Sequence, residues 1–249
     1  MFENNRIWII GASTGIGAEL AKALAKQGAR IALSARDNEK LLEVKSSLEG
    51  IDHGTYSLDV TDAEKVKATA ERVAKDFGRI DSVIFMAAAY KPHDGKEPDI
   101  ATVKQIIDVN FTGALNVVYS ALPILKLQGK GQIVLCASVA GFRGLPNGQP
   151  YCATKAALIN LAESLYIENK DKNIDIRVIN PGFVKTRLTD KNDFEMPFII
   201  TADKAAKYIV KGLKGSKFEI HFPKRFTYFM KLLRILPSSI YFMLAKRIK

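Results

Sequence analysis

Strand-like and helix-like segments alternate along almost the whole chain, and this alternation constrains the fold more than any other feature. Several strand-like segments are continuous apolar runs, such as Ile7-Trp8-Ile9-Ile10 and Ile133-Val134-Leu135. A strand that is apolar on both sides belongs in the middle of a parallel sheet with helices on each face. The order therefore predicts an α/β fold, a doubly wound sheet of seven mostly parallel strands. We expect strands at 6–11, 30–34, 54–58, 82–85, 132–137, 175–180 and 217–221, and helices near 15–28, 38–49, 62–76, 99–127, 149–170 and 201–213.

Composition limits the class of protein. With 47% apolar residues among 249, the chain can bury a large core without disulfides or a metal, and it is too apolar to be intrinsically disordered. Two cysteines, Cys136 and Cys152, exclude a disulfide scaffold, and the three histidines do not combine with them at any usual zinc-ligand spacing. Neither a signal peptide nor an apolar run long enough for a membrane span is visible, so we expect a cytoplasmic protein.

A glycine-rich turn follows the first expected strand and opens the first expected helix. It reads Gly11-Ala-Ser-Thr-Gly15-Ile-Gly17. Glycine permits a close backbone approach, and a helix N-terminus presents free amides to a phosphate. The position of the turn at the start of a doubly wound sheet favours a bound dinucleotide over a turn without a ligand. Contacts to its diphosphate are expected from Gly11, Ser13, Thr14, Gly15, Ile16 and Gly17.

The end of the second expected strand bears on the choice of dinucleotide. A carboxylate there binds the ribose hydroxyls of NAD, whereas a nearby arginine accommodates the 2′-phosphate of NADP. Here a small, neutral residue stands where the carboxylate would be, and Arg36 follows it. This favours NADP(H) over NAD(H). Two observations weigh against a preference for NADP(H). Arg36 can instead be an exposed residue at the start of a helix, and the carboxylate of Asp37 would repel the phosphate if it turned inward. Asp59 and Val60 are expected along the adenine, with Asp59 alternatively a helix N-cap.

Tyr151 and Lys155 stand four residues apart within an expected helix, which places the phenol and the ammonium on one face. An ammonium beside a phenol lowers the pKa of the tyrosine from about 10 and suits it to exchange protons with a carbonyl or hydroxyl. The same spacing also occurs in solvated surface pairs. Ser138 follows an apolar strand, at the carboxyl end where doubly wound sheets bind ligands.

With these motifs the chain resembles the short-chain dehydrogenase/reductase family, in its common branch, over residues 6–221. The resemblance rests on the glycine turn, Ser138, Tyr151 with Lys155, Asn110 in Val109-Asn110-Phe-Thr-Gly113, and Pro181-Gly182 with Thr186. It implies a Rossmann-type fold and an oxidoreductase that interconverts a ketone or aldehyde and an alcohol by hydride transfer. It also implies a homodimer or homotetramer. The alternative is a non-catalytic NADP-binding protein that associates with a membrane or a partner.

The same resemblance implies a role for each matched residue. Tyr151 is the general acid or base, and Ser138 holds and polarises the substrate oxygen. Lys155 binds the nicotinamide ribose and lowers the pKa of the tyrosine, and Asn110 anchors a water in a proton relay. Further contacts to the cofactor are implied for Ala87, Asn110, Tyr151, Pro181, Gly182, Val184 and Thr186.

The chain departs from the family at the end of the fourth expected strand. The family sequence Asn-Asn-Ala-Gly is replaced here by Phe85-Met86-Ala87-Ala88. The second asparagine of the family supports the sheet beside the adenosine. We therefore expect Met86 to replace this polar support by apolar packing.

The substrate side is less defined. The resemblance implies a lid at residues 183–200. Its apolar side chains either face an apolar substrate or pack the lid against the protein. These side chains are Phe194, Met196 and Phe198. Residues 141–150 are expected to form another wall of the pocket, with Leu145 and Gln149 as substrate contacts. The substrate is a small carbonyl compound or alcohol, and the apolar lid hints at a lipophilic one.

The C-terminal segment 222–249 is expected to be a helical tail appended to a single domain at 1–221. Seven basic and no acidic residues lie in 221–249, so the net charge of +11 is concentrated there, which argues against nucleic acid bound across the domain. One apolar stripe at helical spacing is expected from Phe222, Phe226, Phe229, Met230 and Leu233, with Lys224, Lys231 and Arg234 opposite. The stripe and its basic residues could bind an anionic membrane surface. Alternatively, the stripe packs over the opening of the substrate pocket or against a second subunit.

Overall fold

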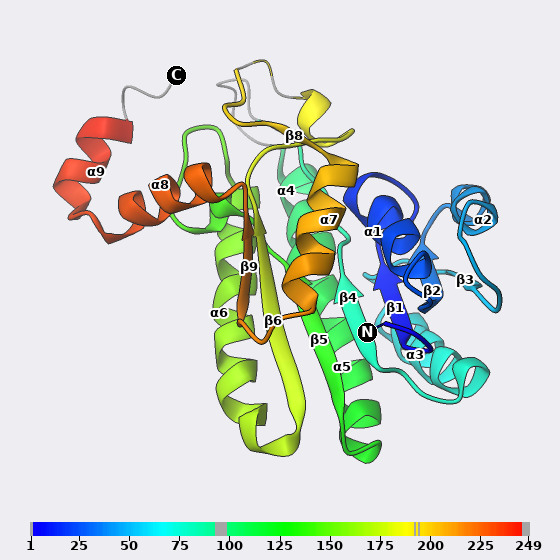
Figure 1. Ribbon diagram of the computed structural model, residues 1–249. Coiled ribbons are helices and arrows are strands. Elements are labelled where there is room, and N and C mark those ends of the chain that lie inside the picture. The colour runs from blue at the N-terminus through cyan, green and yellow to red at the C-terminus, as the bar shows by residue number, and fades with distance from the viewer. Residues whose placement is uncertain (1, 93–98, 192, 194, 246–249) are drawn as a thin grey trace.

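The computed structural model describes residues 2–92, 99–191, 193 and 195–245, and its centre is one parallel β-sheet (Figure 1). Within the described chain the strand order is β3-β2-β1-β4-β5-β6-β9, and every neighbouring pair is parallel. Chain order reverses between β1 and β4, which is the switch point at which such sheets bind ligands. The strands are β1 (Arg6–Ile10), β2 (Arg30–Ala35), β3 (Gly54–Ser57), β4 (Ser82–Phe85), β5 (Gly131–Cys136), β6 (Ile174–Pro181) and β9 (Glu219–Phe222).

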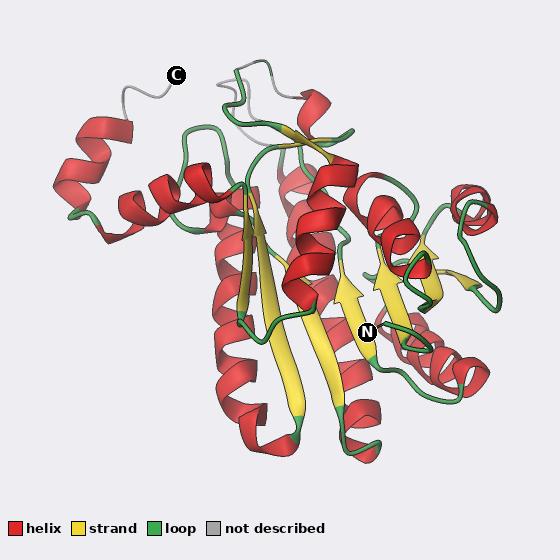
Figure 2. Ribbon diagram, viewed as in Figure 1, coloured by secondary structure: helices red, strands yellow, loops and turns green. Residues whose placement is uncertain are grey.

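Helices cover both faces of the sheet (Figure 2), and the expected α/β fold is confirmed. On one face α1 packs against α7, and on the other α3 packs against α5. Successive residues of a strand point to opposite faces, so Ile9 joins the core beside α1 whereas Trp8 joins the core beside α5. The first face carries α1 (Gly15–Ala25), α2 (Asn38–Ser46) and α7 (Ala202–Leu213), and the second carries α3 (Ala63–Phe77), α4 (Ile100–Ile107), α5 (Gly113–Leu127) and α6 (Tyr151–Asn169).

The single helix expected over 99–127 is interrupted. A π-helical turn at Asp108–Thr112 separates α4 from α5, and Asn110 lies in this turn. A π turn widens the helix by one residue and frequently occurs at functional sites. Asn110 is fully buried there, so the irregular backbone directs a polar side chain into the protein.

A second, two-stranded sheet closes the base of the expected lid. β7 (Val184–Lys185) and β8 (Ile200–Thr201) pair in parallel, Val184 with Ile200 and Lys185 with Thr201. The two ends of the expected lid are therefore held side by side. Figure 1 shows β8 above the carboxyl ends of the main strands.

The tail forms two helices, α8 (Lys224–Ile235) and α9 (Ser238–Ala245), which project beyond the sheet (Figure 1, left). The expected stripe is only partly correct. Phe226 and two further α8 side chains are buried in the core beside α6, but Phe222 ends strand β9 and Phe229 is 54% exposed. The helix begins after the strand, so Phe222 does not share its periodicity. Among the described helices, none combines the length and the apolarity required to cross a bilayer.

Candidate active site

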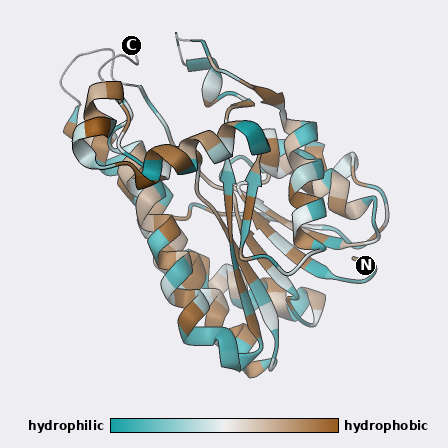
Figure 3. Cartoon of the chain, turned by 60° about the vertical axis from the view of Figure 1, so that its left-hand side comes forward, coloured by the Kyte–Doolittle hydropathy of each residue, from teal (hydrophilic) through white to brown (hydrophobic). Residues whose placement is uncertain are grey.

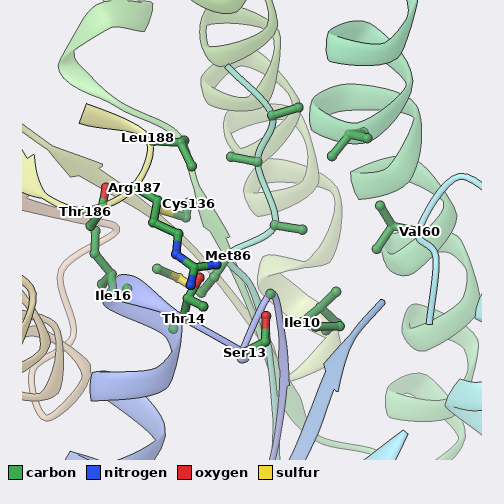
Figure 4. Close-up of a pocket in the computed structure, with 18 of the residues that line it drawn as sticks. Ile10, Ser13, Thr14, Ile16, Val60, Met86, Cys136, Thr186, Arg187 and Leu188 are labelled. Carbon is green, nitrogen blue, oxygen red and sulfur yellow. The ribbon is translucent and has the colours of Figure 1, made fainter. Parts of the chain in front are cut away.

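A groove of about 430 Å³ lies at the carboxyl ends of the central strands, between the glycine turn, the first turn of α6 and the start of the lid. Figure 4 shows part of its lining. The structure places around it every residue expected to bind the cofactor, with one exception, Asn110. The lining residues among those expected are Gly11, Ser13, Thr14, Gly15, Ile16, Gly17, Arg36, Asp59, Val60, Ala87, Ser138, Tyr151, Lys155, Pro181, Gly182, Val184 and Thr186.

The turn from β1 to α1 is too tight for any residue but glycine at two positions. Gly11 has φ +89°, and a Cβ on it would lie 2.5 Å from the backbone nitrogen of Ala87. A Cβ on Gly17 would lie 2.1 Å from the carbonyl oxygen of Gly11. Thr14, the N-cap of α1, makes no side-chain cap bond, so the first amides of the helix are available to a ligand. The turn therefore fits the diphosphate of a dinucleotide.

The carboxylate that opposed NADP binding has a partner within its own helix. Asp37 caps α2 by accepting a hydrogen bond from the backbone nitrogen of Lys40 at 3.1 Å, and it also pairs with the ammonium of Lys40. These bonds from Lys40 lower the pKa of Asp37. The charge of Asp37 is thus largely balanced, while the exposed Arg36 lines the same end of the groove.

Asp59 forms a local turn and is not the cap of the following helix. Its carboxylate accepts hydrogen bonds from the backbone nitrogen and the hydroxyl of Thr61, at 3.0 and 2.8 Å. The N-cap of α3 is Asp62, whose side chain accepts from the backbone nitrogen of Lys65. The cap alternative for Asp59 is therefore wrong, and Asp59 lines the groove beside Arg36.

Three side chains expected in catalysis meet at one point of the groove. Tyr151 is the first residue of α6, and the ammonium of Lys155 lies 5.5 Å from the centre of its ring. The ammonium donates a hydrogen bond to the carbonyl oxygen of Cys136 at 2.8 Å. Ser138 follows β5, and its Oγ accepts from the backbone nitrogen of Ala140 at 3.1 Å. The residues that the sequence separates by up to 17 positions are thus brought together at the end of β5.

Burial shifts the pKa values of Tyr151 and Lys155. Burial raises the pKa of Tyr151, although a hydrogen bond with the Ser138 side chain opposes the effect. Burial also lowers the pKa of Lys155, whose side chain is 1% exposed. The net shift of the Tyr151 pKa is therefore upward, opposite to the expected direction, because burial disfavours the phenolate. The phenol is protonated at neutral pH and can donate a proton.

Asn110 lies behind the groove and joins two of its walls. Its side chain accepts a hydrogen bond from the backbone nitrogen of Ala89 at 2.6 Å and donates to the Ala89 carbonyl oxygen at 3.0 Å. It also donates to the hydroxyl of Thr154 at 3.1 Å. That hydroxyl donates to the carbonyl oxygen of Tyr151 at 2.7 Å, so Asn110 connects the segment after β4 to the first turn of α6.

Four of the residues expected to touch the substrate are described by the structure, and they lie outside the lining of this groove. Leu145 packs on the core, and Gln149 is exposed on the loop before α6. Met196 is half-buried in the lid, and the ring of Phe198 packs against that of Phe226 at 6.2 Å. Phe194 falls outside the described residues. Phe198 thus docks the lid on α8, and contact of these residues with a substrate stays a prediction.

Several groove residues were not expected from the sequence. Met86 and Cys136 occupy or follow the carboxyl ends of β4 and β5, so the position of each strand end could have indicated them. Met86 packs against apolar core residues, as the replacement of asparagine predicted. Tyr90, which is not part of the groove lining, packs its ring edge-on against Tyr151, with centroids 5.0 Å apart. Arg187, in the lid, lines the groove beside Thr186.

Comparisons with known proteins agree with this geometry. The sequence model of the family described as short chain dehydrogenase matches residues 5–196. An uncharacterized oxidoreductase of Myxococcus xanthus is 32% identical over 246 residues, which cover 97% of this chain and 96% of that protein. Uncharacterized oxidoreductases of Mycobacterium tuberculosis and Staphylococcus epidermidis are each 33% identical, over 79% and 82% of this chain and 80% and 89% of their own lengths. The chain belongs to the short-chain dehydrogenase family, a family of oxidoreductases that use nicotinamide cofactors.

Proposed function

We propose that this protein is an NADP(H)-dependent oxidoreductase that interconverts a ketone or aldehyde and the corresponding alcohol. The observation that carries the proposal is the meeting of Tyr151, Ser138 and Lys155 in the same groove as the glycine turn. A non-catalytic NADP-binding protein has no need for a proton donor at this point. The enzyme is therefore favoured over that alternative.

The chain's own groups suggest how the reaction proceeds. When bound, the nicotinamide supplies the hydride to the carbonyl carbon, or accepts it from the alcohol. In the direction of reduction Tyr151 donates its proton to the carbonyl oxygen, since burial keeps the phenol protonated. The hydroxyl of Ser138 donates a hydrogen bond to the same oxygen and stabilises the charge that develops on it. Lys155 lies beside the phenol and stabilises the phenolate that remains.

The test is the substitution Tyr151→Phe, which removes the proton donor and keeps the ring. We expect kcat to fall by a factor of about 10² to 10⁴, with the Kd for NADPH within a few fold of wild type. Turnover is measured by NADPH absorbance with carbonyl compounds of graded chain length. Tyr119→Phe is the matched control, because Tyr119 is 63% exposed on α5 and away from the groove. Turnover that survives in Tyr151→Phe would defeat the proposal.

The preference for NADP(H) is proposed on the charges at the end of β2. Arg36 lines the groove there, and the neighbouring carboxylate of Asp37 is paired with Lys40. We expect Arg36→Ala to raise the Kd for NADPH about tenfold or more and to leave the Kd for NADH nearly unchanged, since a charged hydrogen bond to the 2′-phosphate is lost. The exposed Arg72 of α3 provides the control Arg72→Ala. An equal effect of Arg36→Ala on both dinucleotides would refute the preference.

Self-association and a membrane contact are the further proposals. A homodimer or homotetramer follows from the family, and the exposed Ile167 of α6 suits contact with a second copy. Light scattering would then give two or four times the mass of one chain.

The outer face of the tail suits contact with an anionic membrane surface, because large apolar side chains are exposed there among basic ones. These apolar side chains include Tyr228, Phe229, Leu232, Ile235, Phe242 and Met243. Figure 3 shows hydrophobic and hydrophilic residues interspersed along these two helices.

A further inference from the structure

Arg187 is a cation of the lid that lines the cofactor groove. It follows strand β7 and Thr186, and its residue is part of the same lining as Ser13 and Thr14 of the glycine turn. In Figure 4 its side chain extends from the segment after β7 toward this turn, and in this view the guanidinium is drawn near Thr14. Nothing in the sequence pattern distinguished Arg187 from the other charged residues of the lid.

The backbone on either side of Arg187 is held close to the turn. A Cβ on Gly15 would lie 3.3 Å from Cγ2 of Thr186, so the residue before Arg187 lies directly against the turn. Thr189 fixes the other side, because its hydroxyl accepts from the backbone nitrogen of Thr186 at 2.9 Å and donates to the Val184 carbonyl oxygen at 2.8 Å. Arg187 therefore starts from a fixed position within a side chain's length of the phosphate-binding amides.

The other cations of the groove already have defined places. Lys40 pairs with Asp37, and the ammonium of Lys155 is bound to the Cys136 carbonyl oxygen. Arg36 lies at the far end, beside Asp59. Among the described residues no carboxylate forms an ion pair with Arg187. A guanidinium beside a helix N-terminus fits an anion with two neighbouring oxygens.

We propose that Arg187 binds the diphosphate of the nicotinamide dinucleotide, on the side opposite the amides of α1. This inference rests on the proposed function, which supplies the dinucleotide. The diphosphate carries two negative charges, and the partial charge of a helix N-terminus balances only about half of one. Arg187 supplies a full charge at this place, so the segment that begins the lid contributes directly to cofactor affinity.

The experiment compares two ligands by equilibrium calorimetry on the full chain. NADPH contains both the diphosphate and the 2′-phosphate, whereas adenosine 2′-monophosphate contains only the latter. We expect Arg187→Gln to raise the Kd for NADPH about tenfold and to leave the Kd for adenosine 2′-monophosphate within twofold of wild type. Arg36→Ala should weaken both ligands. The matched control is Lys185→Gln, which removes an exposed cation two residues earlier, on β7 and outside the groove lining.

The outcomes separate this inference from the proposed function. A wild-type protein that binds neither NADPH nor NADH defeats the proposed function itself. If wild type binds NADPH and Arg187→Gln binds it within twofold as tightly, only the role of Arg187 is refuted. The same holds if Arg187→Gln weakens both ligands equally, or if Lys185→Gln weakens NADPH as much as Arg187→Gln does. Arg187 is exposed, so its substitution leaves the core intact, and thermal unfolding monitored by circular dichroism checks this.

Discussion

Lys155 is the residue whose properties depend most on its place in the fold. Its side chain is almost fully buried, and its ammonium donates a hydrogen bond to the carbonyl oxygen of Cys136. Burial disfavours the charged form, so the pKa of Lys155 in the folded chain lies below its ordinary value. The buried charge therefore lowers the free energy of unfolding at low and neutral pH. This destabilisation is lost as the pH rises toward the ordinary pKa of lysine.

The first prediction concerns this pH dependence. Lys155→Met removes the buried charge and should abolish turnover. We expect the Tm of the variant minus the Tm of wild type to be most positive near pH 7 and to fall as the pH rises toward about 10, because wild type alone is relieved of a buried proton. Differential scanning calorimetry across this range measures the trend. The control Lys185→Met alters an exposed lysine and should show no such slope; a difference that grows with pH would contradict the argument.

At this scale the sequence predicted which residues meet, but not how they ionise. The spacing of Tyr151 and Lys155 placed both on one face of α6, and the structure has them there. The direction of the tyrosine pKa was wrong, because it depends on burial by segments distant in sequence. Asn110 was matched by its motif, while its partners, Ala89 and Thr154, follow from a π-helical turn that the sequence did not indicate.

Phe226 of α8 packs against two aromatic side chains of the lid. The ring of Phe226 is 7% exposed and lies 5.4 Å from the ring of Phe183 and 6.2 Å from that of Phe198. Phe229, three residues further along the same helix, points outward. The two phenylalanines therefore serve different purposes on one element: the first joins lid, tail and core, and the second faces solvent.

The second prediction uses this pair. Phe226→Ala should lower the free energy of unfolding by about 3 kcal/mol, since it leaves a cavity where three aromatic rings meet. Phe229→Ala should change it by less than about 0.5 kcal/mol, as is usual for exposed positions. Both values come from denaturant unfolding followed by circular dichroism. Equal destabilisation by the two substitutions would show that α8 does not pack as described.

At the scale of elements, strands were easier to predict than helix boundaries. Every described strand of the main sheet lies within two residues of its expected bounds, and continuous apolar runs mark the buried parallel strands β1, β4 and β5. The expected helix over 99–127 contains no residue before Gly113 that signals an interruption, so the π-helical turn was missed. In the tail, the spacing of apolar residues continued from β9 into α8 and concealed the boundary between them.

Charge is distributed unevenly over the whole molecule. Seven of the 37 basic residues, and none of the 26 acidic ones, lie in the last 29 positions. Lys224 and Arg225 are exposed beside Tyr228 and Leu232 on α8. Each cation near an anionic bilayer contributes about 1 kcal/mol, so this end of the molecule is the one that such a surface would attract.

The third prediction tests the membrane contact. The protein should co-sediment with vesicles that contain phosphatidylglycerol, and much less with vesicles of phosphatidylcholine alone. The double substitution Leu232→Glu with Ile235→Glu should reduce sedimentation with the anionic vesicles about tenfold or more, because it places charge on the exposed apolar face. Tyr119→Glu adds one negative charge elsewhere on the surface and serves as the control. Wild-type protein that stays in the supernatant, or a double variant that sediments as wild type does, excludes this contact.

Arg143 connects the tail to the loop that precedes Tyr151. Its guanidinium donates to the carbonyl oxygens of Leu233 and Leu236 at 3.3 and 2.5 Å, and it lies 4.6 Å from the ring centre of Tyr241. Tyr241 in turn donates its hydroxyl proton to the Gly144 carbonyl oxygen. Removal of α8 and α9 would thus take away the contacts that support this loop, together with the basic residues of the tail. A substitution in α8 or α9 can therefore alter the loop before Tyr151 without touching the groove itself.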